Sequence, residues 1–276
     1  MNKGETLAVP YADLTSDIVE SLTPQDAERI AIGLLAENAR VKEGGLILSW
    51  SEFNENPDPL VNKLLARMIV GQFDRQKLVG LAAWQFAVLS IESSASYLAM
   101  QLTEEMERSF HLSRPPRIIR ARKLPRGESP SPAMSERKLA VTVHPITAGG
   151  EPRTLVASLP DDDQGLHRIR AIVVVDDFKA TKSTLNGGIA LGINLFSRFT
   201  DPKNLFIIPT AALGKPDQER YAHDTPTTAV VWDTITAVDV HFWGDPQTGN
   251  AFIQANGFEP VVMQRATASD FKRGGL

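Results

Sequence analysis

The chain has 276 residues, of which 42% are hydrophobic, enough for one large domain or two small ones with a sizeable core. Its formal net charge of −4 gives no basic excess for nucleic acid or for an anionic membrane. It contains no cysteine, which excludes disulfides, thiolate chemistry and cysteine-based metal sites.

No segment approaches the ~20 apolar residues that cross a bilayer, and the N-terminal residues lack the apolar core of a signal peptide. The five histidines are scattered without the spacing of a zinc site. We therefore expect a cytoplasmic protein that binds neither membrane nor nucleic acid.

The first 75 residues have a mostly helical pattern. In each of two segments a capping residue and a proline precede apolar residues at helical spacing. The predicted helices are 22–41, capped by Thr23, and 58–73, capped by Asp58.

The pattern of residues 76–213 predicts an α/β domain with a mainly parallel, twisted sheet flanked by helices. Glycines at 187–192 indicate that the helix containing them packs closely against its neighbours. The expected elements are strand 77–83, helix 84–110, strand 116–123, a hairpin of 138–146 with 153–160, strand 171–177, helix 184–199 and strand 204–213.

Residues 214–276 are weakly patterned, with short apolar runs separated by turns. We expect a few strands and long loops there, as a small β-rich addition packed on the core. The sequence thus predicts three parts: a helical N-terminal segment (1–75), an α/β core (76–213) and a C-terminal addition (214–276).

Two adjacent aspartates, Asp176 and Asp177, directly follow the buried run of 171–175. In an open parallel sheet, ligands bind beyond the carboxyl ends of the strands, where these acids are expected. The next residues lead into a helix N-terminus, whose unpaired N–H groups and dipole favour an anion. A carboxylate pair suits adjacent hydroxyls or a hard cation, so a sugar phosphate with a vicinal diol fits both features.

An Asp-Asp pair after a strand is also typical of a solvated turn. The apolar run before the pair and the Thr/Lys/Ser/Thr cluster after it favour a binding site over that alternative.

The segment VVVDDFKATKST (173–184) resembles the 5-phosphoribosyl-1-pyrophosphate (PRPP) motif of type I phosphoribosyltransferases. That motif is an apolar strand, two acidic residues and a loop ending in Thr-Gly-x-Thr. The resemblance covers roughly residues 76–213. It implies that Asp176 and Asp177 bind the ribose hydroxyls, act in catalysis and hold Mg²⁺ indirectly through the substrate. It further implies that the 5′-phosphate and ribose are bound by Ala180, Thr181, Lys182, Ser183 and Thr184.

The segment RARKLPR (120–126) is similar to a basic segment of adenine-type family members. This likeness implies that Arg120, Arg122 and Lys123 contact pyrophosphate, the last two as catalytic residues. The polar stretch and hairpin of 127–160 would then form the mobile catalytic loop.

The implied activity is transfer of the 5-phosphoribosyl group from PRPP to a nitrogenous base, with a purine-like acceptor favoured, and release of pyrophosphate. The family also implies a homodimer. Two features depart from the family pattern: Lys182 replaces a glycine, and the expected pyrophosphate loop contains Ala82, Ala83 and Trp84. They favour an alternative, a non-catalytic PRPP- or nucleotide-binding sensor of the same fold. A hydrolase or pyrophosphorylase acting on another sugar phosphate is a third alternative.

Overall fold

The computed structural model divides the chain into two compact units. One unit comprises residues 62–239, and the other comprises residues 1–61 together with 240–276. This division differs from the predicted boundaries at 75 and 213. The structure describes residues 14–42, 45–48, 59–92, 95–124, 138–143, 153–159, 165–179, 183–214, 228–239, 251, 254–255, 257 and 261–263.

The unit that contains both chain ends combines helices with a small sheet. Strand β1 pairs antiparallel with β2 and parallel with β11, so the N-terminal region is not purely helical. Helix α2 confirms most of the predicted helix 22–41, whose last three residues belong to strand β1 instead. The predicted cap is also confirmed: the Asp26 N–H donates to Thr23 Oγ1 at 3.2 Å, and that hydroxyl donates to the Asp26 carboxylate at 2.6 Å. The elements are α1 (Ser16–Ser21), α2 (Pro24–Asn38), β1 (Ala39–Lys42), β2 (Gly45–Leu48) and β11 (Val261–Met263).

The larger unit is built on an eight-stranded sheet with the order β10-β8-β7-β3-β4-β6-β5, in which β9 also pairs with β8. Neighbouring strands are parallel from β10 to β4, and β4, β6 and β5 are antiparallel. The predicted α/β class with a mainly parallel sheet is therefore confirmed. The strands are β3 (Phe86–Ile91), β4 (Arg117–Lys123), β5 (Lys138–Val143), β6 (Arg153–Ser158), β7 (Ala171–Lys179), β8 (Phe206–Gly214), β9 (Val230–Val231) and β10 (Ile235–Asp239).

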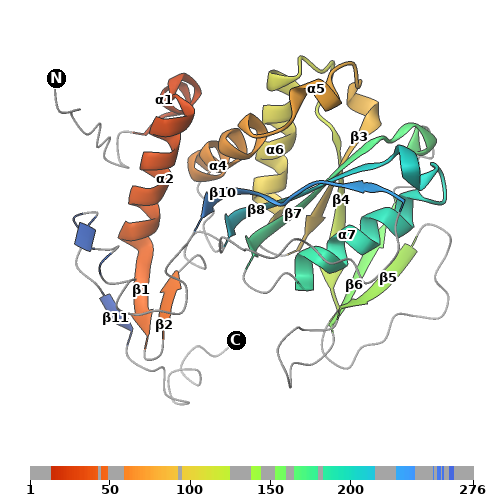
Figure 1. Cartoon of the computed structure of the whole chain (residues 1–276). Coiled ribbons are helices and arrows are strands. Elements are labelled where there is room, and N and C mark those ends of the chain that lie inside the picture. The colour runs from red at the N-terminus through yellow and green to blue at the C-terminus, as the bar shows by residue number, and fades with distance from the viewer. Residues whose placement is uncertain are drawn as a thin grey trace, which may run out of the picture. The chain divides into compact units, whose positions relative to one another are not determined.

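Helices cover both faces of this sheet (Figure 1). Helix α6 packs against β3, β4 and β7, and α7 packs on the other face against β5, β7 and β8. None of the described helices is long and apolar enough to cross a bilayer. The helices are α4 (Pro59–Gly71), α5 (Arg75–Leu78), α6 (Ala95–Ser109) and α7 (Ser183–Phe196), with short 3₁₀ turns η2 (Ala83–Gln85), η3 (Leu166–Arg168) and η4 (Pro202–Asn204).

Two predictions for residues 77–110 are wrong. The predicted strand 77–83 is the end of α5 followed by a turn, in which Gly80 has a φ of +85°. The predicted helix 84–110 is strand β3 followed by α6. Every residue of β3 is buried. A strand covered on both faces is apolar throughout, so its periodicity cannot distinguish it from part of a buried helix.

The remaining predicted elements of the core are confirmed at 116–123, in the hairpin, and at 171–177, 184–199 and 204–213. The sheet also extends further along the chain than expected, because β9 and β10 join it beside β8. Residues 230–239 thus belong to the main sheet rather than to a separate addition.

Helix α7 approaches the sheet closely at Gly188, which confirms the packing indicated by the glycines of 187–192. A Cβ atom at Gly188 would lie 2.6 Å from Ile91 Cδ1 and 2.8 Å from Val174 Cγ1. A Cβ at Gly192 would find its nearest neighbour, Ile172 Cγ2, at an ordinary 3.5 Å. The missing side chain at Gly188 therefore sets how near α7 lies to β3 and β7.

We predict that Gly188→Ala lowers the free energy of unfolding by ~1–3 kcal/mol, because overpacking forces neighbouring side chains or backbone to move. The matched variant Gly192→Ala is expected to be neutral or to stabilise by up to ~1 kcal/mol, since glycine disfavours a helix interior. Urea denaturation of the full chain measures both. Equal effects of the two substitutions would contradict the close approach at Gly188.

Candidate functional site

The order of the parallel strands creates a switch point between β3 and β7. Numbered along the chain, β4-β3-β7-β8-β10 has the order 2-1-3-4-5. The chain leaves β3 through α6 on one face and leaves β7 through α7 on the other. Ligands of open α/β sheets bind in the crevice that this reversal leaves beyond the carboxyl ends of the strands.

Asp176 lies near the carboxyl end of β7, next to this switch point. It pairs with Ala211 of β8 and is 3% exposed. Because strand side chains alternate between faces, Asp176 lies on the same face as Val174, which contacts α7 at Gly188. The structure thus places this carboxylate below α7, the helix that follows it in the chain.

The other residues of the predicted phosphate loop are only partly described. Thr184 lies in the first turn of α7 and is partly buried. Residues Ala180, Thr181 and Lys182 lie outside the described residues, as do the side chains of Asp177 and Ser183. Of this predicted site, the structure describes the side chain of Asp176 within β7 and that of Thr184 in α7.

Strand β4 presents Lys123 on the face occupied by α7. Ala121 pairs with Ile91 of β3, which contacts α7 at Gly188. Lys123, two residues further on, pairs with Leu155 of β6, a buried member of the core beneath α7. Lys123 therefore shares its face of the sheet with Asp176.

Arg120 and Arg122 lie on the opposite face of β4. Both side chains are exposed, whereas Ile119 and Ala121, which alternate with them, are buried in the core. The structure therefore separates the three predicted pyrophosphate contacts, since only Lys123 shares the face of Asp176. The alternation of side chains along the predicted strand 116–123 was the sequence signal for this separation.

The hairpin predicted as part of a mobile catalytic loop is part of the sheet. Strand β6 pairs with β4, and its residues Leu155 and Ala157 are almost completely buried. Helix α7 packs against β5. The intervening stretches 125–137 and 144–152 lie outside the described residues. Strand β6 is thus part of the core, and β5 pairs with it at the edge of the sheet.

The prediction that the pyrophosphate loop lies at Ala82 to Trp84 is wrong. These residues precede β3 and lie at the amino edge of the sheet, away from Asp176. The carboxyl end of β3 is followed instead by Glu92, whose N–H donates to Ala121 O at 2.7 Å. The sequence signal for the carboxyl end of β3 was an apolar run followed by an acid and serines, FAVLSIESS (86–94).

Ser90 is a second residue that the sequence analysis missed. It is fully buried, and its Oγ has no hydrogen-bond partner within the described part of the chain. It pairs with Val175 of β7 and with Arg120 of β4. Thr210 of β8 continues this row, and its hydroxyl donates to Val174 O at 3.1 Å. These polar groups lie on the face of the sheet opposite Asp176.

No group of three or more His, Cys, Asp or Glu side chains in the described ranges is arranged to hold a metal ion. An all-protein metal cage therefore does not form there. A divalent cation held mainly by substrate oxygens needs only one or two carboxylates from the protein.

No protein-family model and no curated protein matches this sequence. Among solved structures, an adenine phosphoribosyltransferase from Thermoanaerobacter pseudethanolicus is similar at 12% identity and a TM-score of 0.43, covering 76% of this chain and 99% of that one. A hypothetical protein from Neisseria gonorrhoeae with bound ppGpp has 12% identity and a TM-score of 0.36, with coverage of 71% and 92%. A hypoxanthine phosphoribosyltransferase from Staphylococcus aureus has 14% identity and a TM-score of 0.34, with coverage of 63% and 73%. Similarity at this level assigns neither a family nor an activity, so function has to be argued from the site.

We predict that Ser90→Ala leaves stability unchanged or raises the free energy of unfolding by ~1 kcal/mol, because it removes a buried hydroxyl that lacks a partner. Thr210→Val, which removes a hydroxyl that does have a partner, is expected to lower it by ~1–2 kcal/mol. Chemical denaturation compares the two. A loss of stability in Ser90→Ala equal to that in Thr210→Val would show that the Ser90 hydroxyl is already satisfied.

Proposed function

We propose that the chain binds PRPP at the carboxyl edge of β7 and transfers its 5-phosphoribosyl group to a nitrogenous base, releasing pyrophosphate. The observation that carries this proposal is the position of Asp176, which is buried near the carboxyl end of β7 beside the switch point, on the face covered by α7. The resemblance of 173–184 to the PRPP motif suggests PRPP as the substrate. The resemblance of 120–126 to the basic segment of adenine-type family members favours a purine-like acceptor.

Different residues of the proposed site bind different parts of PRPP. The Asp176 and Asp177 carboxylates accept hydrogen bonds from the two ribose hydroxyls, and burial of Asp176 strengthens its bond through the low local dielectric. Residues 180–184 and the first N–H groups of α7 hold the 5′-phosphate, since a helix N-terminus favours an anion. This arrangement fixes the position of the ribose C1 atom for attack.

The donor set fits Mg²⁺, because carboxylate oxygens next to substrate phosphates are the ligands that this ion prefers. Asp176 and Asp177 would hold it through the ribose hydroxyls. When bound, the ion neutralises negative charge on the pyrophosphate.

Lys123 has the main protein role at the leaving group. As the acceptor nitrogen bonds to C1, the bond from C1 to the pyrophosphate oxygen breaks, and the nitrogen later releases its proton. Negative charge grows on the pyrophosphate, and an ammonium group on the Asp176 face stabilises it more in the transition state than in the ground state. The reaction then depends mainly on positioning and charge.

A second candidate is a PRPP sensor without turnover. The observation that favours it is the separation of Arg120 and Arg122 from Asp176 by the sheet, which leaves fewer cations on the substrate face. A pyrophosphate-release assay over a panel of bases distinguishes the two. Release with one base supports the transferase, and binding without release supports the sensor.

We predict that Asp176→Asn with Asp177→Asn weakens PRPP binding at least ~100-fold, since each hydrogen bond to a charged group contributes ~1.5–3 kcal/mol. Isothermal titration with PRPP and Mg²⁺ measures the affinity. The control is Asp201→Asn with Asp233→Asn, which removes the same charge from two exposed positions of the larger unit and is expected to leave the affinity within about twofold. Unchanged affinity in the first variant would refute the site.

We predict that Lys123→Met weakens PRPP binding ~10-fold or more, because it removes one charge-assisted hydrogen bond from the Asp176 face. The matched variant Arg122→Met removes a cation from the neighbouring residue on the other face, and its effect is expected to stay within about twofold, as for an exposed charge. The same titration measures both. A larger loss in Arg122→Met would mean that the pyrophosphate lies on the opposite side of the sheet.

A further inference from the structure

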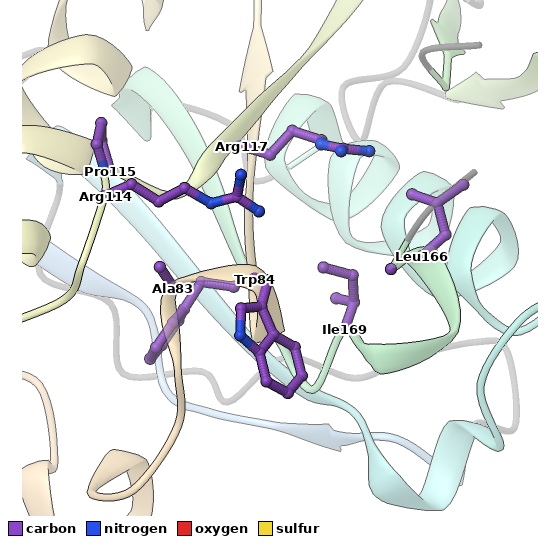
Figure 2. Close-up of a pocket in the computed structure, with 9 residues that line it drawn as sticks. Ala83, Trp84, Arg114, Pro115, Arg117, Leu166 and Ile169 are labelled. Atoms are coloured by element: carbon purple, nitrogen blue, oxygen red, sulfur yellow. The ribbon is translucent and has the colours of Figure 1, made fainter. Parts of the chain in front are cut away.

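A hollow lies at the amino edge of the sheet, at the opposite end of the strands from Asp176. It has a volume of about 250 Å³ (Figure 2). Its walls come from the segments that enter β3, β4 and β7, so the six residues of β3 separate it from the carboxyl edge. At ~3.3 Å per strand residue, that separation is about 20 Å. The lining residues are Ala83, Trp84, Phe86, Arg114, Pro115, Arg117, Gly165, Leu166 and Ile169.

The floor of this amino-edge pocket is apolar and closely packed. Four of its lining residues are at most 3% exposed: Ala83, Phe86, Leu166 and Ile169. Trp84, by contrast, is 39% exposed, although it is the largest apolar side chain of the lining. A large exposed aromatic side chain at the edge of a hollow is typical of a ligand-binding surface.

The wall at 165–170 is fixed before any ligand arrives. Gly165 adopts a φ of +103°, which favours glycine, and starts the 3₁₀ turn η3. The Arg170 guanidinium donates to Ile169 O at 3.1 Å and to His167 O at 3.3 Å. The Thr200 hydroxyl donates to the same His167 carbonyl at 3.1 Å. The pocket is therefore preorganised, which reduces the entropy lost on binding.

The charges at this pocket all have one sign in its described segments. Residues 83–86, 114–117 and 165–170 contain arginines but no aspartate or glutamate. Figure 2 shows the Arg114 and Arg117 side chains along one side of the hollow and the Trp84 indole on the other. Arg168 adds a further cation, with its Cζ 5.1 Å from the centroid of the Trp84 ring.

We propose that this amino-edge pocket binds a small anion that carries a flat aromatic ring, such as an aromatic monophosphate or carboxylate. The guanidinium fork of Arg114 matches the oxygens of a phosphate or carboxylate. The indole of Trp84 supplies a face for the ring, and the apolar floor receives its edge. The volume lies just below the ~300–1,000 Å³ of most ligand pockets, so the ligand is small. This site is independent of the proposed PRPP site.

Phenyl phosphate is the probe, because it has the ring and the anion but lacks the ribose diol that the carboxyl edge would recognise. Binding to the full chain is followed by titration calorimetry and tryptophan fluorescence. Saturable binding at least ~10-fold tighter than that of inorganic phosphate or of phenol is expected, since ring and anion both contribute. Equal affinity for phenyl phosphate and inorganic phosphate would overturn the aromatic part of the proposal, and absence of saturable binding would overturn it altogether.

Variants locate the binding. Arg114 is exposed, so Arg114→Met is expected to fold normally and to weaken phenyl phosphate binding ~10-fold or more. Two control variants change residues near the carboxyl edge of the sheet: Arg120→Met, and Asp176→Asn with Asp177→Asn. Each is expected to leave the affinity for phenyl phosphate within about twofold. Trp84→Leu should remove the preference over inorganic phosphate. Binding that Arg114→Met leaves intact, or that the aspartate variant abolishes, would overturn the assignment.

A ligand at Arg114 competes with acidic residues of the chain itself, and three of these lie near Gly165 in the sequence. Asp161 to Asp163 precede Gly165 and lie outside the described residues. If phenyl phosphate binds only after these three aspartates are changed to asparagine, the arginines serve the chain's own carboxylates, and the ligand site is refuted.

Discussion

The contact of α7 with β3 and β7 is the constraint on which the proposed PRPP site depends. Because Gly188 has no side chain, the helix lies directly against Ile91 and Val174. Its N-terminus is then held where β7 ends, so that the carboxylate of Asp176 and the helix amides lie at one edge of the sheet. A side chain at this one helix position would move α7 away from β7 and so separate the two halves of the proposed PRPP site.

The same packing explains why the two faces of the sheet differ chemically. The face covered by α7 is apolar between Arg117 at its amino end and Asp176 and Lys123 at its carboxyl edge. The face toward α6 carries the buried hydroxyls of Ser90 and Thr210 in one row with Arg120. A ligand at the switch point therefore meets different groups from the two faces, and under the proposed function the face on which the pyrophosphate lies decides which residues contact it.

Much of this arrangement could be predicted from the sequence where local patterns were unambiguous. The β-branched run 171–175 followed by two acids specified β7, and Thr23 specified the start of α2. Strand β3 could not be identified, because its apolar residues run almost directly into the apolar periodicity of α6. That error moved the expected pyrophosphate loop to the wrong end of the strand.

Other features depend on contacts between residues far apart in sequence. Which face of the sheet Arg120 and Lys123 occupy follows from the pairing of β4 with β3 and β6. The amino-edge pocket is formed by three separate segments, 83–86, 114–117 and 165–169, so no single stretch of the sequence predicts it. The pairing of β10 with β8 likewise depends on tertiary contacts rather than on local sequence.

The most direct test of the account is a crystal structure of the chain with PRPP and Mg²⁺ bound. The account predicts the ribose hydroxyls within hydrogen-bonding distance of the Asp176 carboxylate and the 5′-phosphate at the N-terminus of α7. PRPP bound elsewhere on the molecule, with Asp176 making no contact to it, would contradict the account.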